Sequence, residues 1–278
     1  MTDINNLLFT LFIYIGSFFA GLLGSLTGLG GGVIVVPMLT VFFGVDIHFA
    51  AGASLISVIA TSSGAASAYV KEGYSNIRIG MFLEIATTVG AVAGAILAGI
   101  IPANMISIIF GGILVYSAVS SFLTKKEKDN FKGVNKYASL LKLKGEYPTP
   151  YGEKSYSVQN VPFGFALSSL AGIASGLLGI GGGAIKVIAM DRVMKIPFKV
   201  SATTSNFMIG VTAAASAGIY LKHGYILAPL AMPVMLGVLT GAFLGAKLLT
   251  LISSKNLKII FSIIILIMAF EMFKNGLK

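Results

Sequence analysis

The sequence predicts an all-α, multi-pass membrane protein built from two inverted repeats. Apolar residues make up 56% of the 278-residue chain and charged residues only 11%, and the mean hydropathy is +0.91. Most of the surface must therefore suit lipid instead of water. A glycine-rich pentapeptide at 28–32 returns 151 residues later at 179–183. Apolar segments follow each copy in the same order, which is typical of an internally duplicated transporter.

Continuous apolar runs divide both halves into the same series of segments. The first half has runs at 7–27, 33–44, 47–70, 79–101 and 104–123. The second half has runs at 161–178, 184–193, 198–221, 225–251 and 255–273. We therefore expect a first transmembrane repeat over 1–123, a polar connector over 124–160 and a second transmembrane repeat over 161–278.

The connector at 124–160 is the one polar stretch of the chain. It carries eight Lys against four acidic residues, together with Pro148, Pro150 and Gly152. A segment of this composition has too little apolar surface to fold by itself. We therefore expect a solvated cytoplasmic tether with little structure of its own.

The run after each glycine-rich turn is too short to cross a membrane. As helices, the runs 33–44 and 184–193 would be about 15–18 Å long, whereas a hydrocarbon core is about 30 Å thick. Each is therefore expected to form a broken, re-entrant hairpin with the run before it, followed by three transmembrane helices. An odd number of crossings in each half places the second half upside down relative to the first.

The basic residues give an independent indication of this topology, because cytoplasmic loops carry an excess of Lys and Arg. With the amino terminus outside, sixteen of the twenty basic residues fall on the cytoplasmic side. Two equivalent turns differ most in charge. The turn of the first half contains Asp46 and His48, and the turn of the second half contains Arg192, Lys195 and Lys199. We therefore expect the two halves to present the same loop to opposite faces of the cell membrane.

The glycine-rich turns are the main candidates for a ligand site. A helix that begins after such a turn has backbone N–H groups without intrahelical acceptors, and its amino terminus carries partial positive charge. Glycine also permits positive φ and the close approach of a ligand. We predict that one small oxyanion binds between the turns near the membrane midplane. The predicted residues are Gly28, Gly30, Gly31, Gly32, Gly179, Gly181, Gly182 and Gly183.

The alternative role for these glycines is structural, because small residues commonly allow close helix packing in membranes. Two roles are also open for the small polar residues in the segment after each turn. Ser54 and Ser205 are equivalent in the repeat, as are Thr61 and Thr212, and Asn206 follows Ser205. We predict that Ser54, Thr61, Ser205 and Asn206 donate neutral hydrogen bonds to the anion. Their alternative role is bonding to the preceding turn of their own helix.

Two charged residues interrupt otherwise apolar segments. Lys186 stands three residues after the second glycine turn, where the first half has Val35. Glu84 is the one acid clearly interior to a predicted crossing helix. Charges inside a membrane are costly and usually functional. Lys186 is expected to contact the substrate, to pair with Glu84 or to extend to the membrane surface, and Glu84 is the candidate carrier of a coupling proton.

Several functional classes lack the residues that they need. The chain has no Cys and only two His, so no metal site and no cofactor are predicted. An enzyme would need a nucleophile with its base, a metal cluster or paired acids, and none is evident. The net charge of +10 is concentrated in short connections and in the connector instead of forming a stripe, so nucleic-acid binding is not predicted.

The residues around both turns have a recognisable pattern. Residues 21–32 read GLLGSLTGLGGG and are followed by Pro37, and residues 171–183 read AGIASGLLGIGGG. In these stretches the chain resembles the sulfite exporter TauE/SafE family of multi-pass membrane proteins. The resemblance implies transport of a sulfur-containing oxyanion such as sulfite, a sulfonate or sulfoacetate. The second copy departs from the pattern at Ile188, which replaces Pro37.

The sequence therefore predicts a secondary transporter that moves a small anion by alternating access between two inverted halves, with protons as the candidate coupling ion. An anion channel that uses the same site is the alternative. A channel would conduct far faster than a transporter turns over and would not be coupled to a proton gradient.

Overall fold

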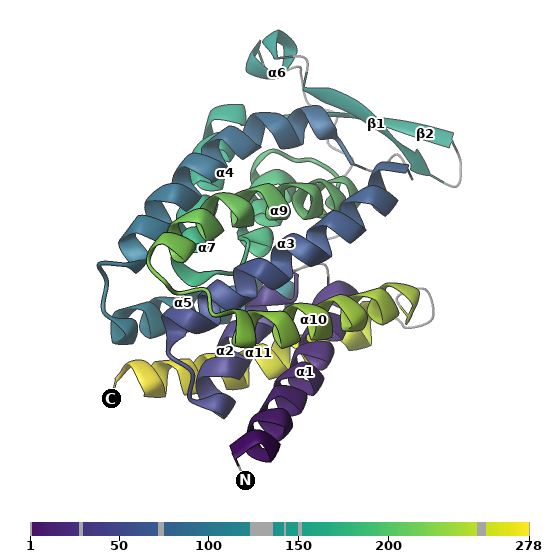
Figure 1. Ribbon diagram of the computed structural model, residues 1–278. Helices are drawn as coiled ribbons and strands as arrows, with labels where there is room; N and C mark the ends of the chain where they lie inside the picture. The colour runs from purple at the N-terminus through teal and green to yellow at the C-terminus, as the bar shows by residue number, and fades with distance from the viewer. Residues whose placement is uncertain are drawn as a thin grey trace.

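The computed structural model describes residues 2–27, 30–71, 75–122, 136–141, 143–149, 152–248 and 254–277, and most of these are helical (Figure 1). The first half contains α1 (Thr2–Thr27), α2 (Gly32–Phe43), α3 (Ile47–Lys71), α4 (Ile77–Ala98) and α5 (Ala103–Phe122). The second half contains α7 (Val161–Leu178), α8 (Gly183–Ile188), the π-helical turn η1 (Ala189–Val193), α9 (Phe198–Lys222), α10 (Ala228–Leu248) and α11 (Ser254–Gly276). Each predicted apolar run coincides with helix over most of its described residues.

Local sequence accounts for several helix ends. Gly44 ends α2 and Gly179 ends α7, both with left-handed backbone angles, at φ of +63° and +70°. Glycine adopts this conformation without a steric cost, which makes it the common residue after a helix. Asn76 begins α4, where its side-chain oxygen accepts a hydrogen bond from the N–H of Ile79 at 3.0 Å. Such a bond satisfies one of the free donors at a helix start.

By length and composition, four of the helices in the described part of the chain can cross a membrane, namely α1, α4, α7 and α10. Large apolar side chains lie exposed on their surfaces, including Phe163 on α7 and Phe243 on α10. Exposed apolar surface of this extent suits contact with lipid tails. The described residues are therefore those of a membrane protein.

The two arms of each expected hairpin differ in length. α1 has 26 residues and α7 has 18, so they are about 39 Å and about 27 Å long. Both are long enough to cross a membrane, and they coincide with the predicted runs at 7–27 and 161–178. The second arms remain short, since α2 has 12 residues and α8 has six before η1.

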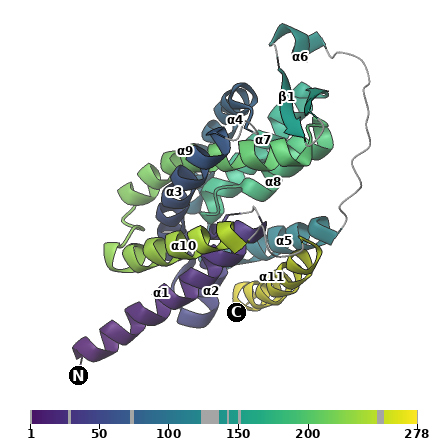
Figure 2. The same ribbon diagram turned by 90° about the vertical axis from the view of Figure 1, so that its right-hand side faces the viewer.

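α3 and α9 form the centre of the bundle. Each has 25 residues, and they pack against each other, with the remaining helices around them (Figure 2). α9 buries a series of small polar residues, namely Ser201, Thr203, Thr204, Ser205, Thr212 and Ser216. Because these helices contact protein more than lipid, they do not need the uniformly apolar composition of the outer helices.

The two halves pack on each other through corresponding helix pairs. α1 packs along α10, α4 packs along α7, and α5 packs along α11. A methyl group added at Gly90 of α4 would collide with the carbonyl oxygen of Ser169 in α7. One added at Gly241 of α10 would collide in the same way with that of Phe18 in α1. Gly90 and Gly241 are equivalent in the repeat, and so are Phe18 and Ser169.

Other glycine contacts recur in the same exchanged manner. Gly94 faces Ile173, and the equivalent Gly245 faces Leu22. In the same way, Gly172 faces Thr87, and the equivalent Gly21 faces Val238. In every case the helix that supplies the glycine in one half corresponds to the helix that supplies it in the other. Each glycine contact from the first half to the second is therefore matched by an equivalent contact from the second half to the first.

The connector is not the unstructured tether that its composition predicts. α6 (Lys136–Leu140) precedes an antiparallel hairpin of β1 (Lys144–Thr149) and β2 (Gly152–Ser157). Lys144 pairs with Ser157, and Thr149 pairs with Gly152 at the turn. The expectation of an all-α chain is thus wrong for this segment. Residues 124–135, 142, 150 and 151 of the connector lie outside the described residues.

A few buried side chains hold the hairpin against the helices. Leu143, Tyr156 and Val158 belong to an apolar cluster that also includes side chains of α4, α7, η1 and α9. The side-chain amide of Asn76 donates a hydrogen bond to the Tyr156 hydroxyl at 2.7 Å. Burial raises the pKa of Tyr156 to about 12, and the Asn76 hydrogen bond opposes this rise. The prediction failed because it used the average composition of the connector, in which these few buried residues have little weight.

The close glycine packing can be tested at Gly241. A valine side chain there would collide with the α1 backbone, so we expect Gly241→Val to lower the free energy of unfolding by about 1–3 kcal/mol. Thermal unfolding in detergent measures the loss. Gly112→Val is the matched control, because a methyl group at Gly112 meets nothing within 4 Å. Equal losses in both variants would contradict the packing described above.

Candidate functional site

The second glycine turn connects α7 to α8 through backbone angles that favour glycine. Gly179, Gly181 and Gly182 have φ of +70°, +72° and +69°, where other residues are strained. Gly182 is the residue that precedes α8, and no side chain caps that helix. The first N–H groups of α8 therefore have no intrahelical or side-chain cap acceptors.

The first turn is described from Gly30 onwards, so the predicted site residue Gly28 lies outside the described residues, as does Leu29. Gly30 has φ of +80°, and a methyl group there would meet nothing within 4 Å. Gly31 has an ordinary helical φ of −64° and precedes α2, which also has no side-chain cap. Gly31 and Gly32 are instead required by space, because a methyl group at either would lie 2.7 Å from a neighbouring side-chain atom.

The two turns lie against each other in the buried centre of the bundle. A methyl group at Gly32 would be 3.3 Å from the Cα atom of Ile180 in the second turn. The hydroxyl of Ser54 in α3 donates a hydrogen bond to the Gly179 carbonyl at 2.8 Å, and a methyl group at Gly32 would lie 2.7 Å from the same hydroxyl. This conformation is closed, since Gly32 and Ile180 leave no room for an anion between them.

The predicted hydroxyl residues divide into two groups. Ser205 donates to the Gly183 carbonyl at 3.2 Å, so that Ser54 and Ser205 both hold the second turn. Thr61 donates to carbonyl groups of its own helix at 2.9 and 3.2 Å, which is the back-bonding alternative. Asn206 is partly buried next to Ser205 on α9.

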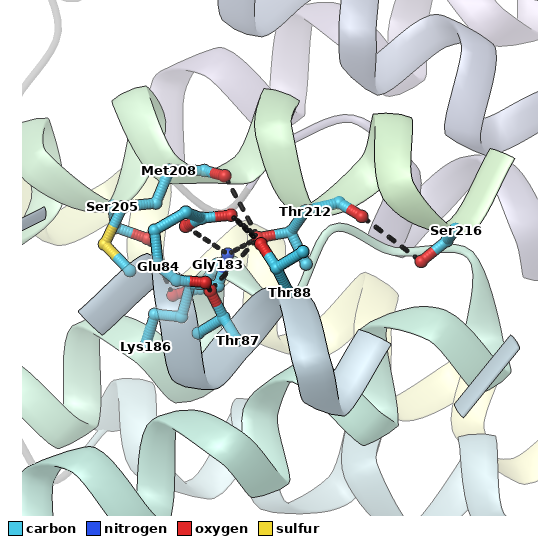
Figure 3. A network of polar contacts seen from close by, with 9 residues as sticks. All are labelled: Glu84, Thr87, Thr88, Gly183, Lys186, Ser205, Met208, Thr212 and Ser216. Atoms are coloured by element: carbon cyan, nitrogen blue, oxygen red, sulfur yellow. Dashed lines mark hydrogen bonds and ion pairs between the residues drawn. The ribbon is translucent and has the colours of Figure 1, made fainter. Parts of the chain in front are cut away.

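Lys186 and Glu84 meet beside α9 (Figure 3). Lys186 is fully buried, and Glu84 on α4 is 7% exposed. The Lys186 Nζ atom lies 3.9 Å from Glu84 Oε2. The Thr212 hydroxyl bridges the pair, because it accepts from Lys186 Nζ at 2.5 Å and donates to Glu84 Oε1 at 2.6 Å. This geometry agrees with the predicted pairing of Lys186 with Glu84 and contradicts its extension to the membrane surface.

Two further threonines complete the surroundings of Glu84 (Figure 3). Thr88 Oγ1 donates to Glu84 Oε1 at 3.2 Å. Thr87 Oγ1 donates to the Glu84 backbone carbonyl at 3.1 Å and lies 3.4 Å from Thr212 Oγ1. Within the described part of the chain, Glu84 Oε2 has no hydrogen-bond partner. Sequence reasoning missed Thr87 and Thr88, although their spacing of three and four residues from Glu84 places them on its side of the helix.

The charged pair exists in one half of the molecule. The residues equivalent to Glu84 and Lys186 are Met235 and Val35, and the residue equivalent to Thr212 is Thr61. The equivalent positions of the charged pair in the other half are therefore apolar. Because a buried ion pair is weak support for stability, its presence at one of two equivalent positions points to a functional role.

The two histidines of the chain lie together at another place in the molecule. His48 and His223 both pack against the Tyr225 ring, with centroid separations of 4.9 and 5.6 Å. His48 Nδ1 lies 2.8 Å from an Asp46 carboxylate oxygen, and its Nε2 lies 2.9 Å from the Ala98 carbonyl oxygen. These contacts fasten the turn before α3 to the end of α4. Over the described residues, no three His, Asp or Glu side chains gather as a metal site.

Comparisons with known proteins cover nearly the whole chain. The family model described as sulfite exporter TauE/SafE matches residues 13–272. The chain is 28% identical to the probable membrane transporter protein YunE of Bacillus subtilis (strain 168), across 93% of this chain and 95% of that protein. It is also 28% identical to the probable membrane transporter protein MJ0441 of Methanocaldococcus jannaschii, across 96% of each chain. No solved structure gives a significant match.

The buried pair can be tested by installing the residues of the other half. Glu84→Met and Lys186→Val each leave one unpaired buried charge, so each should lower the free energy of unfolding by about 3–5 kcal/mol. The double variant has the same apolar combination as Met235 and Val35, and should recover most of that loss. Thermal unfolding of the two single variants and the double variant measures the coupling. Additive losses would show that the two side chains are not paired.

Proposed function

We infer that the chain, which belongs to the sulfite exporter TauE/SafE family, is a secondary transporter that moves a small sulfur-containing oxyanion by alternating access. That it is a membrane transporter follows from the family and from relatives that are named as such. The observation that carries the anion proposal is the contact of two glycine turns in the buried centre, beside the buried Lys186 ammonium.

The chemistry around the turns favours an oxyanion. The first N–H groups of α2 and α8 have no side-chain cap, and such groups bind anions readily. The ammonium of Lys186 and the hydroxyl groups of Ser54 and Ser205 add further donors nearby. Sulfite, a sulfonate or sulfoacetate is the proposed substrate class, because the family is described by sulfite export.

The inverted arrangement of the halves is supported by the exchanged glycine contacts. The contact of Gly90 with Ser169 recurs between Gly241 and Phe18, as a pseudo-twofold relation between the halves requires. If the axis lies in the membrane plane, two equivalent conformations exist that open to opposite sides. The asymmetric distribution of basic residues supports a protein of the cell membrane that has its amino terminus outside and its connector in the cytoplasm.

The closed packing of the turns favours a transporter over a channel. A channel needs a continuous path, whereas the space beside Gly32 is too narrow even for an added methyl group, which would lie 2.7 Å from Ser54 Oγ and 3.3 Å from the Cα atom of Ile180. An anion therefore requires the turns to separate, which couples its passage to a conformational change. A conductance far above the turnover rate of a transporter, measured in reconstituted bilayers, would favour the channel instead.

A binding and transport measurement tests the proposal. The purified protein is heated with sulfite, sulfate, thiosulfate, sulfoacetate or taurine, because an anion that binds the native state raises its unfolding temperature. Anions that bind are then tested for uptake into proteoliposomes. We expect at least one sulfur oxyanion both to bind and to be taken up. A panel without binding would contradict the proposed function.

Gly30 and Gly44 provide a matched pair of variants for the uptake assay. Both have positive φ, and a methyl group at either meets nothing within 4 Å, so asparagine fits at each with little strain. Gly30→Asn narrows the proposed anion position and should abolish uptake while the protein remains folded. Gly44→Asn, at the far end of α2, should retain it. Equal uptake by both variants would remove the first turn from the site.

The proposed orientation can be tested by labelling single cysteines, since the chain has no native Cys. Gly224 and Glu153 are both exposed, and the model of topology places them on opposite sides. Gly224→Cys should react with a membrane-impermeant maleimide in intact cells, and Glu153→Cys should react after the membrane is opened. Equal labelling of both in intact cells would contradict the inverted arrangement.

A further inference from the structure

We propose that the carboxylate of Glu84 occupies the position of the transported anion in this closed conformation, and that one proton binds to Glu84 for each anion admitted. The inference rests on the proposed function and assigns the anion to a defined set of side chains. It extends the proposed site from the glycine turns to Lys186, Thr212 and Thr88, where Lys186 lies one helical turn after the start of α8.

Donors from three helices converge on the Glu84 carboxylate. Lys186 Nζ on α8 lies 3.9 Å from Oε2, while Thr212 on α9 and Thr88 on α4 donate to Oε1 at 2.6 and 3.2 Å. An ammonium and two hydroxyl groups around one carboxylate are the groups that a small oxyanion requires. Since Glu84 Oε2 has no hydrogen-bond partner in the described structure, the carboxylate fills the site without using all of its bonding capacity.

The charge balance of the site decides how an anion can enter. At present the site holds one positive and one negative group, both almost completely buried. An anion that enters while Glu84 is ionised leaves one uncompensated negative charge, which lowers affinity by about 100- to 1,000-fold. A proton from water that binds the Glu84 carboxylate removes this penalty. The contact of Lys186 with Glu84 is then broken and one between Lys186 and the anion is formed.

Other charged groups do not supply this compensation. Glu84 lies on α4, which packs on α7 and α9, and Lys186 of α8 lies beside it. α7 contains no charged residue, and α9 carries Lys199 and Lys222 only near its two ends. Arg78 is exposed at the start of α4. Lys186 is thus the cation that faces Glu84 within the described part of the chain, and the site remains neutral when a monoanion and a proton bind together.

The anion position is connected to the second glycine turn. Lys186 lies three residues after Gly183, and the Gly183 carbonyl accepts from Ser205 of α9. When the anion replaces Glu84, α4 of the first half loses the polar contacts of Glu84 with Lys186 and Thr212 of the second half, while its packing on α7 and α9 remains. The exchange of carboxylate for anion therefore releases one polar contact between the halves at the same time as it fills the site.

The test uses a monoanion whose own charge does not change with pH. Methanesulfonate is titrated into the purified protein by calorimetry between about pH 5.5 and about pH 8.5. For the wild type, we expect uptake of about one proton per anion and an affinity that falls by up to about tenfold per pH unit as the pH rises. Glu84→Gln mimics the protonated carboxyl group, and should bind at every pH without proton uptake. Glu271 is partly exposed on α11 and lies 3.7 Å from Lys274, and Glu271→Gln should behave as the wild type.

The direct donors have matched controls in the repeat. Lys186→Met should weaken binding by about 10- to 100-fold, as is expected when one charge-assisted hydrogen bond is lost. Thr212→Val should weaken binding by about fivefold or more. Thr61→Val is the control for Thr212, because Thr61 is its equivalent and, among the described residues, bonds to its own helix. Equal effects of the two threonine variants would place the anion elsewhere.

Proton uptake measured on the wild type alone tests whether Glu84 is protonated when the anion binds. If methanesulfonate binds without proton uptake and with the same affinity at every pH, the role of Glu84 is wrong while the proposed transport function stands. If the wild type binds neither methanesulfonate nor any anion of the thermal-unfolding panel, the proposed function is contradicted and this inference fails with it. Binding that takes up a proton in the wild type but not in Glu84→Gln supports both.

Discussion

A buried ammonium needs a negative partner, and much of the candidate site depends on how Lys186 obtains one. Lys186 stands on a helix of six residues in the centre of the bundle and is completely buried. Its charge cannot reach water, so the carboxylate of Glu84 in the first half neutralises it. The Thr212 hydroxyl connects the two groups by hydrogen bonds. The glycine turn sets the position of this ammonium, because it starts α8 at Gly183. Three helices from both halves are thereby tied together at one point.

Glycine has two separate roles in the molecule. In the helix pairs α1 with α10 and α4 with α7, glycine brings backbones into contact, as at Gly90 and Gly241. In the second turn, Gly179, Gly181 and Gly182 supply positive φ. The first role explains how two apolar halves pack without a hydrophobic force between helices in lipid. The second creates the broken helix that we propose for anion binding, so the alternatives of packing and ligand binding apply to different glycines.

Much of the architecture could be predicted from the sequence because its signals are local or repeated. The positions of the helices follow from apolar runs, and the internal duplication follows from the recurrence of 28–32 at 179–183. The pairing of Lys186 with Glu84 was one of three predicted roles. Features that depend on tertiary contacts were missed. The β hairpin is held by Leu143, Tyr156 and Val158, and Thr88 becomes relevant only because Glu84 faces the second half.

The replacement of an ionised Glu84 by the anion can be measured most directly by infrared difference spectroscopy. Saturating methanesulfonate is added to the protein in lipid at neutral pH. We predict a new carbonyl stretching band of a protonated carboxyl group, which shifts in heavy water and is absent from Glu84→Gln. If the anion binds and no such band appears, Glu84 keeps its charge in the complex and the claim is contradicted.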